Sequence, residues 1–145
     1  MAAEYNFLTW NIRGIATPIK RHRVYSSLRR IHFACLQETH MIATELAKVG
    51  KRWRGQVYGT CYSAFARGVL VSVAPGVPFM KTRVPLDLEG RFVFLEGELD
   101  GKAINIAAVY APNVGQREFL GARSPACFSF LGVPGMWGVT LTVCS

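Results

Sequence analysis

The sequence has few cysteines, and none of them form a close pair. They are Cys35, Cys61, Cys127 and Cys144. These spacings match neither a zinc site nor a dense disulfide framework. The N-terminal stretch also carries Glu4 where a secretory signal has positive charge, and no long apolar run precedes Arg13. We therefore expect free thiols in a reducing compartment, the nucleus or the cytoplasm, and no secretion.

Acidic residues are scarce as well. Nine Asp and Glu stand against seventeen Lys and Arg, twelve of them Arg, so the formal net charge is +8. The planar guanidinium of Arg suits phosphate, and the sequence therefore predicts a polyanionic partner. A length of 145 residues and a hydrophobic content of 50% are those of one domain with a packed core.

Charge of either sign is missing from the last part of the sequence. The last cation is Arg123 and the last acid is Glu118. We interpret this change as a boundary between a domain over residues 1–120 and an unrelated, uncharged tail over residues 121–145. Membrane insertion of the tail is one alternative, but Pro134 and the neighbouring glycines interrupt its apolar run and argue against a span.

The N-terminal part predicts a strand, a helix and a second strand. The strands are expected over Tyr5–Ile12 and His32–Gln37, and the helix in "TPIKRHRVYSSLRRI", with Thr17 as its cap. A right-handed crossover makes the two strands parallel and brings their carboxyl ends to one edge of the sheet. Asn11 and Glu38, which follow the two apolar runs, should therefore lie side by side.

Three cations occupy the first turn of the expected helix. Lys20, Arg21 and Arg23 lie where the helix dipole disfavours positive charge. They either cost a little stability or meet an anion, and a solvated helix face is the plainer alternative.

The remaining segments predict a short helix and a series of antiparallel strands. The helix is expected over Met41–Val49 and closed by Gly50. The strands are expected in "GQVYGTCYSAF", "RGVLVSV", "FMKTRVPL", "RFVFLEGEL" and "KAINIAAVYA". Asp100 and Gly101 between the last two predict a type I′ hairpin. The pattern favours a layered α/β fold over a doubly wound sheet.

Oxygen-bearing side chains follow several of these apolar runs. They are Asn11, Glu38, Tyr110 and Asn113. Hard oxygen ligands at converging strand ends are what a Mg²⁺ site for phosphodiester cleavage needs. Each also has a structural reading: Glu38 as a solvated strand end, Asn11 as a turn cap, Tyr110 as a strand-end aromatic and Asn113 as a turn residue.

Four motifs in order resemble those of the endonuclease/exonuclease/phosphatase superfamily. They are "FLTWNIRGI", "FACLQETH", "ARGVLVSV" and "NIAAVYAPN", and the resemblance covers roughly residues 5–120. It is nearest to the apurinic-type endonuclease domain of the reverse-transcriptase polyproteins of long interspersed retrotransposons, in which "IKRHRV" after the first strand is also typical.

The resemblance implies a fold, a chemistry and a set of site residues. The fold would be a DNase I-like four-layer α/β sandwich, present here as its N-terminal half, and the chemistry Mg²⁺-dependent cleavage of DNA. Glu38 would be a metal ligand and Asn11 its neighbour, Tyr110 would lie against the phosphate and Asn113 would shape the pocket. The implied DNA contacts are Arg13, Lys20, Arg21 and Arg23.

The sequence departs from the family pattern after these motifs. It lacks the Gly-Asp-x-Asn strand end, a later Asp and the terminal Asp-His pair, and no Asp, Glu, His or Lys follows Glu118. We therefore expect a truncated, inactive endonuclease domain whose tail comes from a shifted frame or a misjoined exon. A basic nucleic-acid-binding fragment without catalysis is the alternative. Whether a second chain completes the fold stays open.

Overall fold

The first three elements form the parallel crossover that the sequence predicts. The computed structural model describes residues 4–111 and 137–144. β1 (Phe7–Asn11) lies parallel to β2 (Phe33–Gln37), with Asn11 opposite Gln37. Between them, α1 (Pro18–Ser27) begins where the Thr17 side chain accepts a hydrogen bond from the Lys20 backbone nitrogen. Proline at the first helical position adds to this start signal.

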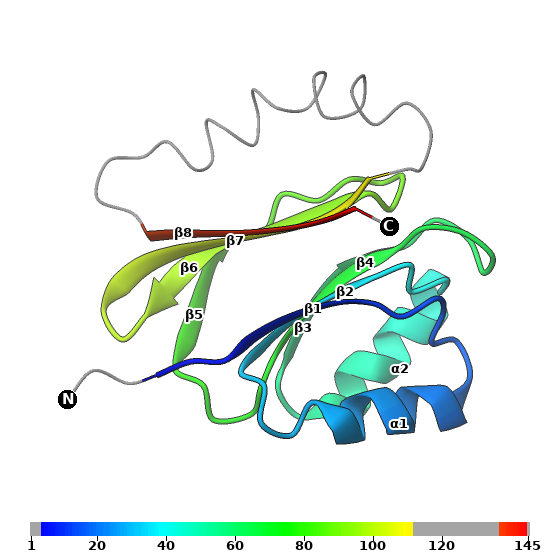
Figure 1. Ribbon diagram of the computed structural model, residues 1–145, viewed down its shortest axis with the longest axis horizontal. Helices are drawn as coiled ribbons and strands as arrows, with labels where there is room; N and C mark the ends of the chain where they lie inside the picture. Colours follow the sequence, from blue (N-terminus) through cyan, green and yellow to red (C-terminus); the bar gives the residue numbers. More distant parts are fainter. Residues whose placement is uncertain (1–3, 112–136, 145) are drawn as a thin grey trace.

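Two four-stranded sheets follow from the rest of the chain. The first sheet has the order β1-β2-β4-β3, with β3 (Gln56–Thr60) and β4 (Val69–Val73), and α2 (Ala43–Trp53) precedes β3. The second has the order β5-β6-β7-β8. Its strands are β5 (Phe79–Arg83), β6 (Phe92–Leu99), β7 (Lys102–Ala111) and β8 (Trp137–Cys144). Figure 1 shows both helices on the face of the first sheet that points away from the second.

The hairpin between β6 and β7 confirms the expected turn. Asp100 and Gly101 both have positive φ, 52° and 75°, which a type I′ turn requires. β7 is a central strand, because β6 pairs with it on one side and β8, parallel to it, on the other. The origin of residues 121–145 in unrelated sequence stays a prediction.

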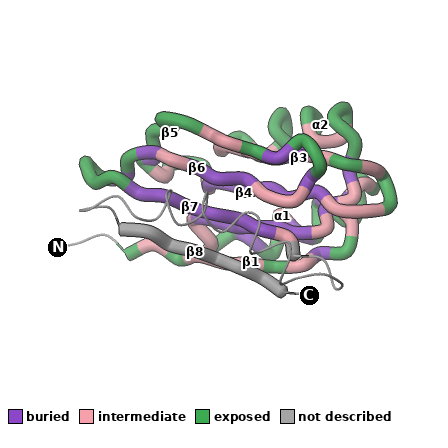
Figure 2. Tube along the Cα trace, turned by 90° about the horizontal axis from the view of Figure 1, so that it is seen from above, coloured by how far each residue is buried: buried purple, intermediate pink, exposed green. Residues whose placement is uncertain are grey.

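Two of the three buried clusters in the described residues lie on either side of the first sheet, and a third, smaller one is formed by residues of β6 and β7. Phe33 and Cys35 of β2 face the second sheet, whereas Ala34 and Leu36 face the helices. This alternation is that of a strand buried on both faces. The ring of Phe33 stacks on Phe7 at 4.8 Å and meets Phe79 edge-on at 5.8 Å, which ties β1, β2 and β5 together. Figure 2 shows the buried positions concentrated in the central strands β4, β6 and β7.

The expected end of α2 at Gly50 is wrong. Gly50 lies inside the helix, which continues to Trp53 and ends at Arg54 in the left-handed conformation. The extra turn is held by Trp53, whose ring lies 4.6 Å from that of Tyr25 on α1 and whose Nε1 donates to the Val73 carbonyl at 2.9 Å. Among the described residues, no helix is long and apolar enough to cross a membrane.

Two glycine substitutions test this arrangement. A Cβ on Gly97 of β6 would overlap the Met80 carbonyl oxygen and the Phe79 ring, so Gly97→Ala should lower the free energy of unfolding by about 1–3 kcal/mol. A Cβ on Gly50 would meet nothing within 4 Å. Gly50→Ala should therefore raise the free energy of unfolding by about 0.8–1 kcal/mol, as Ala replaces Gly inside a helix. Urea unfolding of both variants measures the two effects, and a destabilising Gly50→Ala would contradict the course of α2.

Candidate functional site

The carboxyl ends of β1 and β2 are joined by backbone hydrogen bonds beyond the last paired residues. Ile12 donates to the Gln37 carbonyl at 3.1 Å, Gly14 to that of Glu38 at 2.6 Å and Ile15 to that of Thr39 at 2.9 Å. The two polar strand ends are therefore held side by side, as the crossover predicts. Asn11 does not lie directly opposite Glu38. Its partner in the register is Gln37, and Glu38 is the next residue along the chain.

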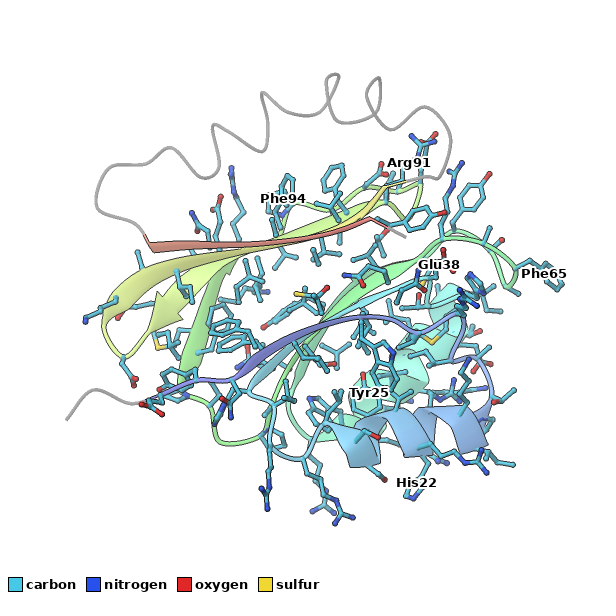
Figure 3. All side chains as sticks on the ribbon, viewed as in Figure 1. His22, Tyr25, Glu38, Phe65, Arg91 and Phe94 are labelled. Carbon is cyan, nitrogen blue, oxygen red and sulfur yellow. The ribbon has the colours of Figure 1, made fainter. Side chains whose placement is uncertain are left out.

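Further backbone hydrogen bonds extend this edge to the second sheet. Thr39 donates to the Gly68 carbonyl at 3.1 Å, and Gly68 donates to the Gly90 carbonyl at 2.9 Å. Tyr110, near the end of β7, donates to the Arg91 carbonyl at 2.7 Å. We call the joined segments the rim; it comprises residues 11–15, 37–40, 67–68, 90–91 and 110. Figure 3 shows Glu38 and Arg91 at the same end of the sandwich, with Phe65 on the loop that extends past them.

Gly68 is a glycine because the rim leaves no room for a side chain there. Its φ is +94°, and a Cβ would overlap the Thr39 hydroxyl oxygen. Gly90, with φ +73°, has the Gly68 backbone nitrogen at 3.0 Å from its own notional Cβ. Both residues lie where loops of the two sheets approach closely, and only glycine adopts this backbone without strain.

Glu38 is the carboxylate of the rim. Its Oε2 lies 3.8 Å from Nε2 of His40, and the two side chains are 18% and 23% exposed. The structure thus places His40 beside Glu38. A half-sheltered carboxylate with an imidazole neighbour can accept a cation or a proton, so these two side chains form the chemical centre of the site.

Buried oxygens lie next to Glu38 on both sides in sequence. Gln37 is 1% exposed; its Nε2 donates to the Thr9 hydroxyl at 2.9 Å, while its Oε1 has no partner among the described residues. The Thr39 hydroxyl is likewise buried without a partner there. Unpaired buried acceptors are costly and often mark a place where water or an ion binds. Sequence reasoning missed Gln37, although its position in "FACLQETH" was the available signal.

The oxygen donors of the rim fit Mg²⁺ only weakly. Within the described residues there is no group of three or more His, Cys, Asp or Glu side chains that could hold a metal ion. Glu38 supplies one carboxylate, and the Asn11 amide oxygen already accepts a hydrogen bond from the Arg13 backbone nitrogen at 3.3 Å. Mg²⁺ keeps several waters and is bound through one or two carboxylates plus substrate phosphates. The rim therefore suits a magnesium ion that arrives with its phosphate.

The other predicted site residues occupy different environments. Tyr110 is half-buried and packs against the core between the sheets, as a strand-end aromatic does. Its backbone also belongs to the rim. Asn113 lies outside the described residues. Arg13, Lys20 and Arg23 are exposed, and Lys20 Nζ donates to the Arg13 carbonyl at 3.1 Å, which ties α1 to the rim.

Arg21 differs from the other cations of α1 because it is buried, at 7% exposure. Its Nη1 donates to the carbonyls of Ile15 at 3.4 Å and Ala16 at 2.9 Å, and to Glu45 Oε2 of α2 at 2.8 Å. The anion that the sequence expected for the first turn of α1 is thus supplied by the protein itself. Arg21 fixes the loop after β1 and joins the two helices, whereas Lys20 and Arg23 are exposed.

Comparison with known proteins identifies the fold. No family model matches the sequence. The chain is similar to AP endonuclease LMAP from Leishmania major, with 19% identity and a TM-score of 0.61 over 88% of this chain and 47% of that one. The chain is 18% identical to the Xenopus laevis APE2 catalytic domain, with a TM-score of 0.62 over 90% of this chain and 57% of that one. It is 14% identical to D. rerio TDP2 complexed with a single-strand DNA product, with a TM-score of 0.63 over 94% of this chain and 58% of that one.

The fold is DNase I-like. This confirms the α/β sandwich expected from the motifs, and the chain spans about half the length of the structures it matches. In the described residues the helices of α1 and α2 and the two sheets make up its layers. At these identities the likeness establishes the fold, and the link to retrotransposons stays a prediction.

The pair between Arg21 and Glu45 predicts a pH dependence of stability. Hydrogen bonds from Arg21 and then from Lys48 hold the pKa of the Glu45 carboxyl below its usual value. A carboxyl with a lowered folded-state pKa contributes stability above its unfolded pKa of about 4.3, and this contribution is lost as the pH falls through the folded pKa. Glu45→Gln should therefore be less stable than the unmodified chain at neutral pH, and the difference should vanish in acid.

Urea unfolding as a function of pH measures this difference. Glu98→Gln is the matched control, because Glu98 is exposed on β6 and has no ion pair among the described residues. A stability difference for Glu45→Gln that stays constant down to about pH 3 would contradict the role of the charged pair.

Proposed function

We propose that this chain is part of a Mg²⁺-dependent DNA endonuclease of the retrotransposon type, and that by itself it binds the DNA backbone without cutting it. The observation that supports the proposal is the rim, whose backbone hydrogen bonds join the segments that carry Asn11, Glu38 and Tyr110, on a fold shared with AP endonuclease and TDP2 structures. One of those structures, D. rerio TDP2, was solved with a single-strand DNA product.

The roles of the rim residues follow from their chemistry. Glu38 would hold Mg²⁺ together with the Asn11 amide oxygen. When bound, the ion would polarise a phosphoryl oxygen and offset the charge that develops on the phosphate. The Asn11 amide and the Tyr110 hydroxyl are hydrogen-bond donors suited to orienting a phosphodiester. His40 would hold the Glu38 carboxylate in place.

Hydrolysis needs one more group, a base that takes a proton from the attacking water. His40 is the titratable neighbour of Glu38 within the described residues, and its Nε2 faces that carboxylate at 3.8 Å. The Asp-His pair of the family has no counterpart in these 145 residues, since neither Asp nor His occurs after Glu118. The chain alone therefore has the scaffold for phosphate binding without the means to activate water.

The charge distribution supports backbone binding. Residues 5–73, which form the first sheet and both helices, carry eleven Lys and Arg and two acids, a net charge of +9. Residues 79–111, which form β5 to β7, carry four Lys and Arg and five acids, a net charge of −1. A polyanion is attracted to the first layer, where Arg13, Lys20 and Arg23 are exposed.

A plasmid-nicking assay tests the expected loss of catalysis. We expect no nicking above background with Mg²⁺, because the water-activating pair is missing. The same assay on Glu38→Ala should give the same result. Mg²⁺-dependent nicking by the unmodified chain that disappears in Glu38→Ala would show that the 145 residues suffice for catalysis.

Salt dependence tests the binding half of the proposal. Arg23→Ala should weaken duplex binding for all sequences and reduce the slope of log K against log salt by roughly one unit for one lost phosphate contact. Lys102→Ala is the matched control, because this exposed cation lies at the start of β7, at the other end of the strand from Tyr110. Fluorescence anisotropy with a labelled duplex measures both slopes. Affinity that does not change with salt would exclude this mode of binding.

A further inference from the structure

A cleft between α1 and α2 lies on the outer side of the first sheet, away from the β-sheet core. It measures about 130 Å³ and is lined by Pro18, Arg21, His22, Tyr25, Val49, Arg52 and Trp53. None of the residues placed at the rim lines it. Figure 3 shows Tyr25 on the side of α1 towards the sheet and His22 projecting away from the body of the molecule. The cleft is therefore separate from the candidate site at the strand ends.

The floor of the cleft holds a buried cation with unused donors. A guanidinium has five N–H groups. The hydrogen bonds of Arg21 to Ile15, Ala16 and Glu45 all come from Nη1, and its Nε and Nη2 have no partner in the part of the chain that the structure describes. Arg21 lines the cleft, so these N–H groups are available to a ligand that accepts hydrogen bonds.

The charges around the cleft favour an anion. Among the residues that the structure describes, no acidic residue lines it. The carboxylate of Glu45 contacts Arg21 at 2.8 Å and Lys48 at 3.1 Å, so two cations outweigh this one acid. Arg52 on α2 is exposed and has no ion pair among the described residues, and His22 is exposed on α1. Two arginines from different helices line one cleft, and together they match the several acceptor oxygens of a phosphate.

Aromatic rings line the same cleft. Tyr25 and Trp53 lie 4.6 Å apart at an interplanar angle of 46°, and both are partly exposed. Their polar ends are engaged elsewhere, the Tyr25 hydroxyl with Ser72 at 2.9 Å and Trp53 Nε1 with the Val73 carbonyl. The ring surface that stays exposed in the cleft is therefore apolar, which suits contact with the planar group of a ligand.

We propose that this cleft binds a phosphate monoester carried on a planar ring, the chemistry of a nucleoside monophosphate. The phosphate lies between Arg21 and Arg52, and the ring lies against Tyr25 and Trp53. A volume of about 130 Å³ equals the space of roughly four waters, which is enough for the phosphate while the ring stays at the mouth of the cleft.

Titration of the full chain with adenosine monophosphate, followed by two-dimensional NMR, tests the proposal. Saturable shifts are expected at the amides of Arg21, His22 and Arg52 and at the Trp53 indole. Arg52→Ala should weaken binding about tenfold or more, the loss of one charge-assisted hydrogen bond. Lys51→Ala is the matched control, because it removes the same charge from an exposed neighbour outside the cleft and should change the affinity by less than about twofold.

Several outcomes would overturn the proposal. An equal loss of affinity in Arg52→Ala and Lys51→Ala would mean that the nucleotide is attracted by the general positive charge and does not bind at a defined site. Inorganic phosphate binding as tightly as the nucleotide would exclude the ring contact, and adenosine binding as tightly would exclude the phosphate contact. Binding that is lost in Glu38→Ala would place the nucleotide at the rim. If Arg52→Ala unfolds the chain, Arg52→Lys, which keeps the charge without the planar fork, should still weaken binding relative to Lys51→Ala.

Discussion

The backbone hydrogen bonds of the rim are the interactions on which the candidate site depends. β1 and β2 belong to one sheet and β7 to the other, so the ends of these strands need bonds that cross from one sheet to the other. The bonds from Gly14 to Glu38, from Thr39 to Gly68 and from Gly68 to Gly90 join these ends in series across the two sheets. The stacking of Phe33 between Phe7 and Phe79 fixes the sheets behind them. Main-chain geometry therefore sets the positions of Asn11, Glu38 and Tyr110, whatever chemistry they carry.

This separation of scaffold and chemistry explains how a nuclease-like fold can exist without a complete catalytic set. The described residues contain the crossover, the close approach at Gly68 and Gly90, and the packed core. Catalysis needs charged groups in addition, and one carboxylate with one imidazole is a small part of them. The excess of cations in the first layer is a separate feature of the chain, and the proposed affinity for phosphate rests on it and not on the rim carboxylate.

Much of the fold could be predicted from the sequence, because local rules agree with the tertiary structure there. Alternating apolar runs give the strands, the crossover rule gives the parallel pair, and Asp100-Gly101 gives the hairpin. The sequence predictions that failed concern features that depend on tertiary contacts. Gly50 signals a helix end, but the contacts of Trp53 with Tyr25 and Val73 carry α2 one turn further. Arg21 looks like its neighbours on α1 in sequence, and its burial depends on Glu45, 24 positions later.

The sequence predicts where the candidate site lies in the fold, but it does not predict the side-chain contacts within the site. Strand ends and motif order locate Asn11, Glu38 and Tyr110, but they do not reveal that His40 turns towards Glu38 or that the Gln37 amide oxygen is buried. The backbone adds a signal that the sequence does not contain. Of the six non-glycine residues with positive φ in the described part of the chain, Arg13, Glu38, His40 and Arg67 lie on the rim.

A left-handed backbone costs a non-glycine residue roughly 1 kcal/mol or more, and glycine would avoid that cost. At Glu38 the conformation is enforced from both sides, by the bond from Gly14 to its carbonyl and by the bond from Thr39 to Gly68. The fold therefore determines the backbone conformation at position 38, and it does not require a carboxylate there. Stability alone would favour glycine at position 38. The backbone strain at Glu38 therefore supports a role for its carboxylate in binding a cation or a phosphate at this edge.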